Sequence, residues 1–276
     1  MAMADIFFII GCARSGTTAL VKMLNTSQNA TVFVEQQPNL CIEARNLYRG
    51  ILGDPKQIIQ EAKSEPIQKT LASGLKYGDK NPNYLPFIPH IAELWDCKFL
   101  FPARDGREVV RSLMDWHDFY NQKFPNSGIF AMKEDDPKSS VDSPEQDWWD
   151  YSRLRPNPGD LYFEEWQQLS RFEKCAWYWA NFNKKALESF SKLDDQRWLQ
   201  VDMKSLDRFK MRQIFDFLGL DGFNADQIGE MINARINSLQ ERAGLPDKFP
   251  RWTDWTQEQR NAFDRIAGDM MQCVVY

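Results

Sequence analysis

Residues 6–24 contain a short apolar run, a glycine loop and a helical pattern in that order, and this segment constrains the fold more than any other. Ile6–Ile10 is rich in β-branched and aromatic side chains and stops at Gly11, which predicts a short buried strand. Thr17 to about Asn25 has the apolar spacing of an amphipathic helix. A buried strand that passes through a glycine loop into a helix is typical of an α/β fold with a parallel sheet.

The loop between Gly11 and Thr18 has the glycine spacing of a phosphate-binding loop but lacks its lysine. In the pattern G-x-x-x-x-G-K-[ST], glycines let backbone N–H groups face an anion, and the lysine contacts the β- and γ-phosphates. Here Thr17 follows Gly16 directly, and the cation lies inside the loop, at Arg14. A guanidinium suits a planar, multi-oxygen anion. The loop therefore predicts a phosphate-like ligand, needs no metal ion and argues against nucleotide hydrolysis.

Two further segments repeat the order of strand and helix. Lys98–Ala103 is an apolar run that leads to Arg104, and Gly106–His117 follows it with the spacing of an amphipathic helix. Arg197–Asp202 is a third candidate strand, followed by a helical pattern at Arg208–Leu218. Strands that alternate with helices predict an α/β fold with a central parallel sheet flanked by helices, whose ligands bind at the carboxyl ends of the strands.

The 276 residues are interpreted as one domain, 1–276, with a variable insertion at 121–168. The insertion holds five prolines, many acids and several aromatic side chains. Two interpretations stay open for it: a poorly ordered surface loop, or a lid or acceptor-recognition segment. Near the C-terminus, Trp252 to Met271 has the spacing of a closing amphipathic helix.

Composition excludes several classes of protein. A net charge of −5 is unfavourable for a nucleic-acid-binding protein, which needs a dense basic surface. Five scattered cysteines without a C-x-x-C pair predict reduced, buried thiols rather than a zinc ribbon or a disulfide framework, and two histidines are too few for a typical histidine metal site. The first apolar run is too short to span a membrane, and no cation precedes it as in a signal peptide, which predicts a cytoplasmic protein.

Arg104 and Ser112 form a second candidate anion site. They are eight residues apart, one at a strand end and the other two turns into the next helix, so both side chains reach toward the helix start. An Arg-Asp sequence at a strand end is, taken alone, most often a structural ion pair. Its combination with the modified phosphate loop favours a ligand site.

Together these two motifs resemble those of the sulfotransferases that use 3′-phosphoadenosine-5′-phosphosulfate (PAPS). Arg14–Thr18, which includes Ser15 and Gly16, resembles the 5′-phosphosulfate loop of that family. Arg104 with Ser112 resembles its 3′-phosphate site. The resemblance implies a P-loop α/β fold, PAPS as the donor, 3′-phosphoadenosine-5′-phosphate (PAP) as the product, and no metal ion.

Other segments extend the resemblance over most of the chain. Asp216–Leu220 resembles a helix end of the family, and Trp252–Tyr276 resembles its final helix. Gly78–Pro82 and Lys98–Arg107 are similar to the Lys-x-Pro and Arg-Asp-Gly-Arg segments of tyrosylprotein sulfotransferases, which give the closest local likeness.

Glu35 lies 21 residues after Arg14, where those enzymes carry the catalytic glutamate. Two positions depart from their pattern. Pro38 stands where they have an arginine near the acceptor peptide, and Trp116 replaces a basic residue. The resemblance therefore supports the same donor chemistry more strongly than it supports the same acceptor.

The resemblance and the chemistry of sulfuryl transfer assign a role to each candidate. Glu35 is the candidate general base, a role typically worth ~10²–10⁴-fold in rate. Lys80 and Arg14 are the candidate cations for the bridging oxygen and the sulfuryl group, each worth ~3 kcal/mol. Thr17 and Thr18 are candidate ligands of the 5′-phosphate.

Lys248 and Arg251 lie where related enzymes close a loop over the nucleotide, and they are candidate ligands of the 3′-phosphate. An ordinary solvated pair of cations is the other interpretation.

Two alternatives to a sulfotransferase stay open. In a P-loop kinase or NTPase, Trp198–Asp202 would be an apolar strand that ends in a magnesium-binding aspartate. A non-catalytic relative would bind the nucleotide without turnover. For the sulfotransferase, the acceptor is a small-molecule, carbohydrate or peptide hydroxyl.

Overall fold

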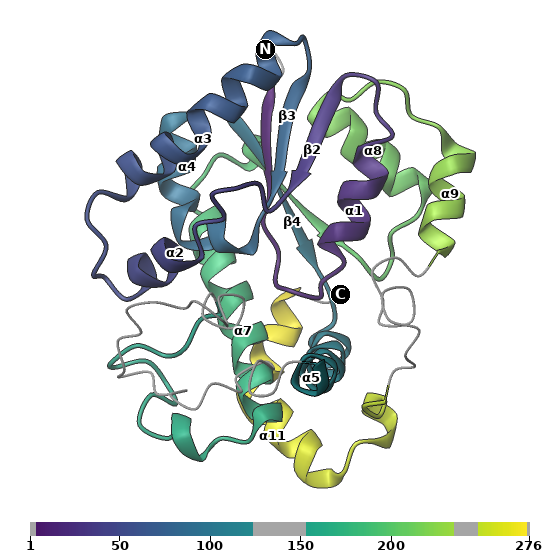
Figure 1. Cartoon of the computed structure of the whole chain (residues 1–276). Coiled ribbons are helices and arrows are strands. Elements are labelled where there is room, and N and C mark those ends of the chain that lie inside the picture. Colours follow the sequence, from purple (N-terminus) through teal and green to yellow (C-terminus); the bar gives the residue numbers. More distant parts are fainter. Residues whose placement is uncertain (1–3, 124–152, 235–247, 275–276) are drawn as a thin grey trace.

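The computed structural model describes residues 4–123, 153–234 and 248–274. They form three layers, with a five-stranded sheet between two sets of helices (Figure 1). The strands are β1 Ile6–Ile9, β2 Ala30–Val34, β3 Lys76–Lys80, β4 Cys97–Ala103 and β5 Trp198–Asp202. The α-helices are α1 Thr17–Leu24, α2 Cys41–Tyr48, α3 Pro55–Ala72, α4 Ile88–Leu94, α5 Gly106–Lys123, α7 Arg171–Phe190, α8 Arg208–Leu218, α9 Ala225–Asn233 and α11 Gln257–Val274. The short 3-10 helices are η1 Pro82–Phe87, η2 Trp166–Gln168, η3 Asp195–Arg197 and η4 Trp252–Asp254.

The sheet is parallel throughout, and its order, β2-β3-β1-β4-β5, places β1 at the centre. Ile9 at the end of β1 is in register with Lys80 on one side and Leu100 on the other. Val34 at the end of β2 is also in register with Lys80. The carboxyl ends of these strands therefore lie side by side along one edge of the sheet, which we call the carboxyl edge. Parallel sheets bind their ligands there.

The core is divided between the two faces of the sheet, because successive side chains of a strand point to opposite sides. On β1, Ile6 and Phe8 belong to a cluster shared with α3, α4, α5, α7 and α11. Phe7 and Ile9 belong to a second cluster, shared with α1, α8 and α9. Both faces are thus covered by helices, as a parallel sheet requires.

The predicted fold class, an α/β fold with a central parallel sheet flanked by helices, is confirmed. β1, β4 and β5 match the predicted strands to within one residue, and α8 has the predicted bounds. The sequence patterns do not predict β2 and β3. Residues 124–152 of the predicted insertion lie outside the described residues.

The expectation of buried thiols is wrong at one position, since Cys273 on α11 is exposed while the other four cysteines are buried. Within the described ranges, no helix is both long and apolar enough to cross a membrane. No group of three His, Cys, Asp or Glu side chains in that part of the chain is arranged to hold a metal ion.

Candidate active site

Segments with predicted site residues follow four neighbouring strands at the carboxyl edge of the sheet. The glycine loop follows β1, Glu35 follows β2, Lys80 ends β3, and Arg104 follows β4. Because β2, β3, β1 and β4 are adjacent in that order, these segments lie next to one another along the edge. The fold therefore brings the candidate base, the candidate cations and the loop to one side of the molecule.

Glycine is required at two points of the loop after β1. Gly16 has a φ of 88°, in the left-handed region that favours glycine. A Cβ added at Gly11 would lie 2.8 Å from Cγ2 of Thr17 and 2.9 Å from the carbonyl oxygen of Pro102. Without side chains at these positions, the backbone passes closely between β4 and the first turn of α1.

The start of α1 has the features of an oxyanion site. Its N-cap residue is Gly16, which has no side chain to cap the first turn. The Ser15 side chain is fully buried, and its Oγ has no hydrogen-bond partner within the described residues. Buried hydroxyls are nearly always hydrogen-bonded, and helix N-termini attract anions. An oxyanion bound at this helix start would give Ser15 the acceptor that it needs.

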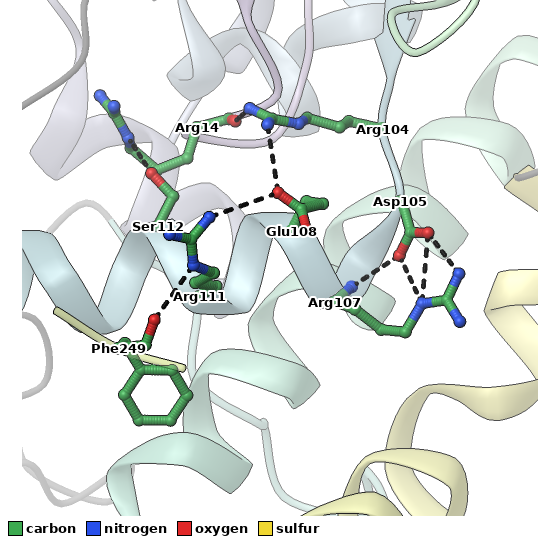
Figure 2. A network of polar contacts seen from close by, with 8 residues as sticks. All are labelled: Arg14, Arg104, Asp105, Arg107, Glu108, Arg111, Ser112 and Phe249. Carbon is green, nitrogen blue, oxygen red and sulfur yellow. Dashed lines mark hydrogen bonds and ion pairs between the residues drawn. The ribbon is translucent and has the colours of Figure 1, made fainter. Parts of the chain in front are cut away.

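Arg14 joins the loop to α5, as Figure 2 shows. Its Nε donates a hydrogen bond to Oγ of Ser112 at 3.0 Å. Its guanidinium carbon lies 4.4 Å from the ring centroid of Trp116, within the range of a cation–π contact. Arg104 in turn donates from Nη1 to the carbonyl oxygen of Arg14 at 3.2 Å. The two anion motifs are therefore in direct contact.

Glu108 lies between two guanidinium groups of the same cluster (Figure 2). Its Oε2 is 3.7 Å from Nη2 of Arg104 and 3.8 Å from Nη1 of Arg111. The Arg104 and Glu108 side chains are 36% and 37% exposed, so this contact contributes little to stability. An anionic ligand can therefore compete with Glu108 for Arg104 at low cost.

Glu35 and Lys80 form an ion pair at the ends of β2 and β3. Lys80 Nζ donates to Oε1 of Glu35 at 2.6 Å, and the N–H of Glu35 donates to the carbonyl oxygen of Lys80 at 2.8 Å. The Lys80 side chain is 8% exposed and that of Glu35 is 35% exposed. The pair thus combines a shielded cation with a carboxylate that a bound substrate can reach.

A buried ion pair that the sequence patterns do not predict lies beneath this site. Lys63 on α3 and Asp79 on β3 are fully buried, with 3.5 Å between Nζ and Oδ2. Lys63 also donates to the carbonyl oxygens of Gln36 and Pro38, at 2.6 Å and 3.1 Å. Burial lowers the pKa of Lys63 and raises the pKa of Asp79, and the attraction between the two opposes both shifts. The loop that follows Glu35 is therefore attached to a buried charge pair.

A short segment before η4 is held on α5 through its backbone. Oδ1 of Asp115 accepts hydrogen bonds from the N–H groups of Lys248 and Phe249, at 2.9 Å and 2.7 Å. Arg111 donates from Nε to the carbonyl oxygen of Phe249 at 3.0 Å (Figure 2). Lys248 and Arg251 are exposed. Both predicted cations therefore stand on a segment fixed to the helix that also carries the Arg14 contact.

Cys12 lies in the glycine loop as a buried thiol. Burial raises its pKa, against a smaller opposing effect of a hydrogen bond to Tyr178. The thiolate is the nucleophilic form of cysteine. Because the thiol stays protonated at neutral pH, a covalent role for Cys12 is not supported.

No protein-family model and no curated protein sequence matches this chain. Solved structures do match it. The sulfotransferase domain from the curacin biosynthetic pathway is similar with a TM-score of 0.51 and 14% identity, over 98% of each chain. The sulfotransferase domain of the Synechococcus PCC 7002 olefin synthase has a TM-score of 0.48 and 15% identity, over 96% of this chain and 94% of that one. A retinol dehydratase in a complex with retinol and PAP has a TM-score of 0.42 and 14% identity, over 100% of this chain and 84% of that one.

The chain has the α/β fold of a sulfotransferase domain, with a central parallel sheet flanked by helices. The resemblance inferred from the glycine loop and the Arg104–Ser112 pair is confirmed at the level of the fold. The closer likeness to tyrosylprotein sulfotransferases stays a prediction from sequence.

Proposed function

We propose that this chain is a sulfotransferase that moves a sulfuryl group from PAPS to an acceptor hydroxyl. The observation that supports this most is the Glu35–Lys80 pair, at the same sheet edge as a glycine loop suited to an oxyanion. A base, a shielded cation and an anion-binding loop are what transfer from a phosphosulfate requires. The loop lacks the lysine with which an NTPase contacts its triphosphate.

The proposed donor-binding residues fall into two groups. The first lies in the loop before α1 and in its first turn and would bind the 5′-phosphosulfate; it consists of Arg14, Ser15, Gly16, Thr17 and Thr18. The second surrounds α5, supplies cations and a hydroxyl, and would bind the 3′-phosphate; it consists of Arg104, Ser112, Lys248 and Arg251. The buried Oγ of Ser15, which has no hydrogen-bond partner among the described residues, and the close backbone approach at Gly11 fit such a donor, which supplies the activated sulfuryl group.

Glu35 would act as the general base. It takes the proton of the acceptor hydroxyl while the acceptor oxygen bonds to sulfur and the bond between sulfur and the bridging oxygen breaks. Lys80 and Arg14 stabilise the negative charge that grows on the bridging and sulfuryl oxygens. The proton passes from Glu35 to water, and the products are the sulfated acceptor and PAP. Because these two cations fill the electrophilic role, we expect no metal requirement.

The acceptor is a hydroxyl of a small molecule, a carbohydrate or a peptide. The proposal also includes two further points. The chain is organised as one domain with a variable insertion, and its location is cytoplasmic. Limited proteolysis of the full chain and fractionation of cells that express it test these two points.

Titration with PAP tests the donor site. We expect saturable binding of PAP with a Kd well below ~1 mM, the Kd of a weak complex. ATP with magnesium should bind more weakly than PAP. A folded sample that binds no PAP at that concentration would contradict the proposal. Magnesium-dependent ATP turnover would favour the P-loop kinase or NTPase instead, and PAP binding without transfer to any acceptor would favour the non-catalytic relative.

Asp115→Ala is expected to weaken PAP binding about 5- to 10-fold, because two backbone N–H groups lose a charged acceptor and the segment with Lys248 and Arg251 detaches from α5. Calorimetric titration measures the Kd, and a melting curve verifies that the variant is folded. The control is Asp216→Ala, an exposed acid on α8 that pairs with Arg212 at 3.7 Å. An unchanged Kd in Asp115→Ala would remove this segment from the donor site.

A further inference from the structure

Lys63 is a buried ammonium with three acceptors. It lies on the inward face of α3, with apolar buried side chains one turn away on both sides. Its Nζ is 2.6 Å from the carbonyl oxygen of Gln36, 3.1 Å from that of Pro38 and 3.5 Å from Oδ2 of Asp79. An ammonium has three N–H donors, so each can be directed to one of these oxygens. Two of the three acceptors belong to the loop directly after Glu35.

Asp79 completes the network from the side of β3. Its Oδ2 accepts hydrogen bonds from the hydroxyls of Tyr84 and Tyr77, the latter at 3.2 Å. The Tyr77 hydroxyl also lies 2.8 Å from Oε1 of Gln36. Gln36 is therefore contacted at its backbone by Lys63 and at its side chain by Tyr77.

Glu35 is held by Lys80 at its carboxylate, where Nζ donates to Oε1 at 2.6 Å, and it stands directly before the loop that Lys63 contacts. Its backbone has a φ of 52°, which non-glycine residues rarely adopt, and its side chain is 35% exposed, so packing around the side chain fixes it only in part. Its own N–H donates to the carbonyl oxygen of Lys80, and the carbonyl oxygen of the next residue, Gln36, accepts from Lys63. The direction of the carboxylate is thus set from both sides of the residue.

We infer that Lys63 is a positioning residue for the proposed base, and that Asp79 is its counter-charge. Because Asp79 directly precedes Lys80 on β3, one buried pair sets both Glu35 and Lys80 in their relative positions. A protein with an apolar pair of similar volume is usually at least as stable as one with a buried ion pair. The stability of the fold alone therefore does not account for these two charges. The inference rests on the proposed function, since it concerns the geometry of the proposed base.

The double variant Lys63→Met with Asp79→Asn tests the inference. Removing both charges leaves no unpaired buried ion, which a single replacement would create. We expect kcat for sulfuryl transfer to fall about 10- to 100-fold, the cost of a base displaced by about 1 Å. The Kd of PAP should change by less than about twofold, because the residues proposed to bind its two phosphates lie elsewhere, in the loop and first turn of α1, after β4, on α5 and in the segment before η4.

The matched control is Arg197→Met, directly before β5, the outer strand on the side of the sheet away from β2 and β3. Arg197 precedes β5 and also donates to backbone carbonyl oxygens, namely those of Ala92 at 3.0 Å, Trp95 at 2.9 Å and Cys97 at 3.2 Å. We expect this variant to lose stability but to keep kcat per folded molecule. It therefore separates general loosening of the fold from displacement of Glu35.

A second arm combines the same double variant with Glu35→Gln. If Lys63 acts chiefly through Glu35, the further loss of kcat in that background should be much smaller than the loss in the unchanged protein, because two effects on one base are not additive. A folded double variant with an unchanged kcat, or a loss of equal size in the Glu35→Gln background, would overturn the inference and leave the proposed function intact. No transfer by the unchanged protein would contradict the proposed function, and the inference with it.

Tyr77→Phe is the milder variant if the double variant does not fold. It removes only the hydroxyl that bridges Asp79 and Gln36. We expect about a threefold loss of kcat with an unchanged Kd for PAP, the size of one lost hydrogen bond. An unchanged kcat in folded Tyr77→Phe would contradict the inference.

Discussion

Replacing Glu35 with glutamine is expected to lower kcat for sulfuryl transfer about 10²–10⁴-fold, because an amide of the same shape cannot take the proton of the acceptor hydroxyl. The Kd of PAP should stay within about threefold, since the loss concerns only the transition state. Initial rates with a saturating donor and a calorimetric titration with PAP measure the two quantities on the same sample.

Glu43→Gln is the matched control for this variant. Glu43 lies in the first turn of α2, eight residues further along the chain. It should leave both kcat and the Kd of PAP unchanged. If Glu35→Gln keeps the full rate, or if both variants lose it equally, Glu35 is not the base.

Replacing Lys80 with methionine is expected to lower kcat about 10²–10³-fold, the effect of removing one preorganised donor to a developing negative charge. In contrast to the Glu35 variant, affinity for PAPS should fall as well, because the ammonium also attracts the charged donor in the ground state. Steady-state rates at varied donor concentration separate the change in kcat from the change in KM.

Lys76→Met is the control for Lys80, because Lys76 begins the strand that Lys80 ends. Lys76 pairs with Asp5 at 2.8 Å near the other edge of the sheet. This variant should keep kcat and KM. Full activity of Lys80→Met would show that the cation at the end of β3 takes no part in transfer.

The part of the site that the sequence predicts best is local in the chain. The run from β1 to α1 is predictable because an apolar strand, two glycines and an amphipathic helix follow one another without a break. Arg104 and Ser112 are placed correctly on a strand end and its helix because a helical period fixes their spacing. Such patterns need no knowledge of the sheet order.

The part that the sequence does not predict depends on partners far along the chain. β3 has the sequence K-Y-G-D-K, which reads as polar, yet Asp79 is fully buried because Lys63 on α3 neutralises it. The contact of Glu35 with Lys80 follows from the pairing of β2 with β3, which periodicity cannot show. One signal is present: Lys63 stands between Ile59 and Ile67 on the same face of α3, and an ammonium buried there requires an acceptor.

Lys248, in the proposed donor-binding site, is a second case in which the sequence does not predict a long-range contact. Its side chain is exposed, as expected for an ordinary surface cation. Its backbone is held in place by the hydrogen bond from its N–H to Asp115. Backbone groups carry no sequence signal, so a segment held in this way is recognised only once the fold is known.

Mass spectrometry of acceptors incubated with PAPS tests the central claim most directly. Each of the three acceptor classes is supplied to the unchanged protein and to Glu35→Gln at equal concentrations of folded protein, and release of PAP is followed in parallel. We predict that a hydroxyl acceptor gains the mass of one SO₃ group, with one PAP released per transfer, and that Glu35→Gln does so at least about 10²-fold more slowly. Equal transfer by both proteins, or magnesium-dependent ATP turnover with no sulfated product in any class, would contradict the account.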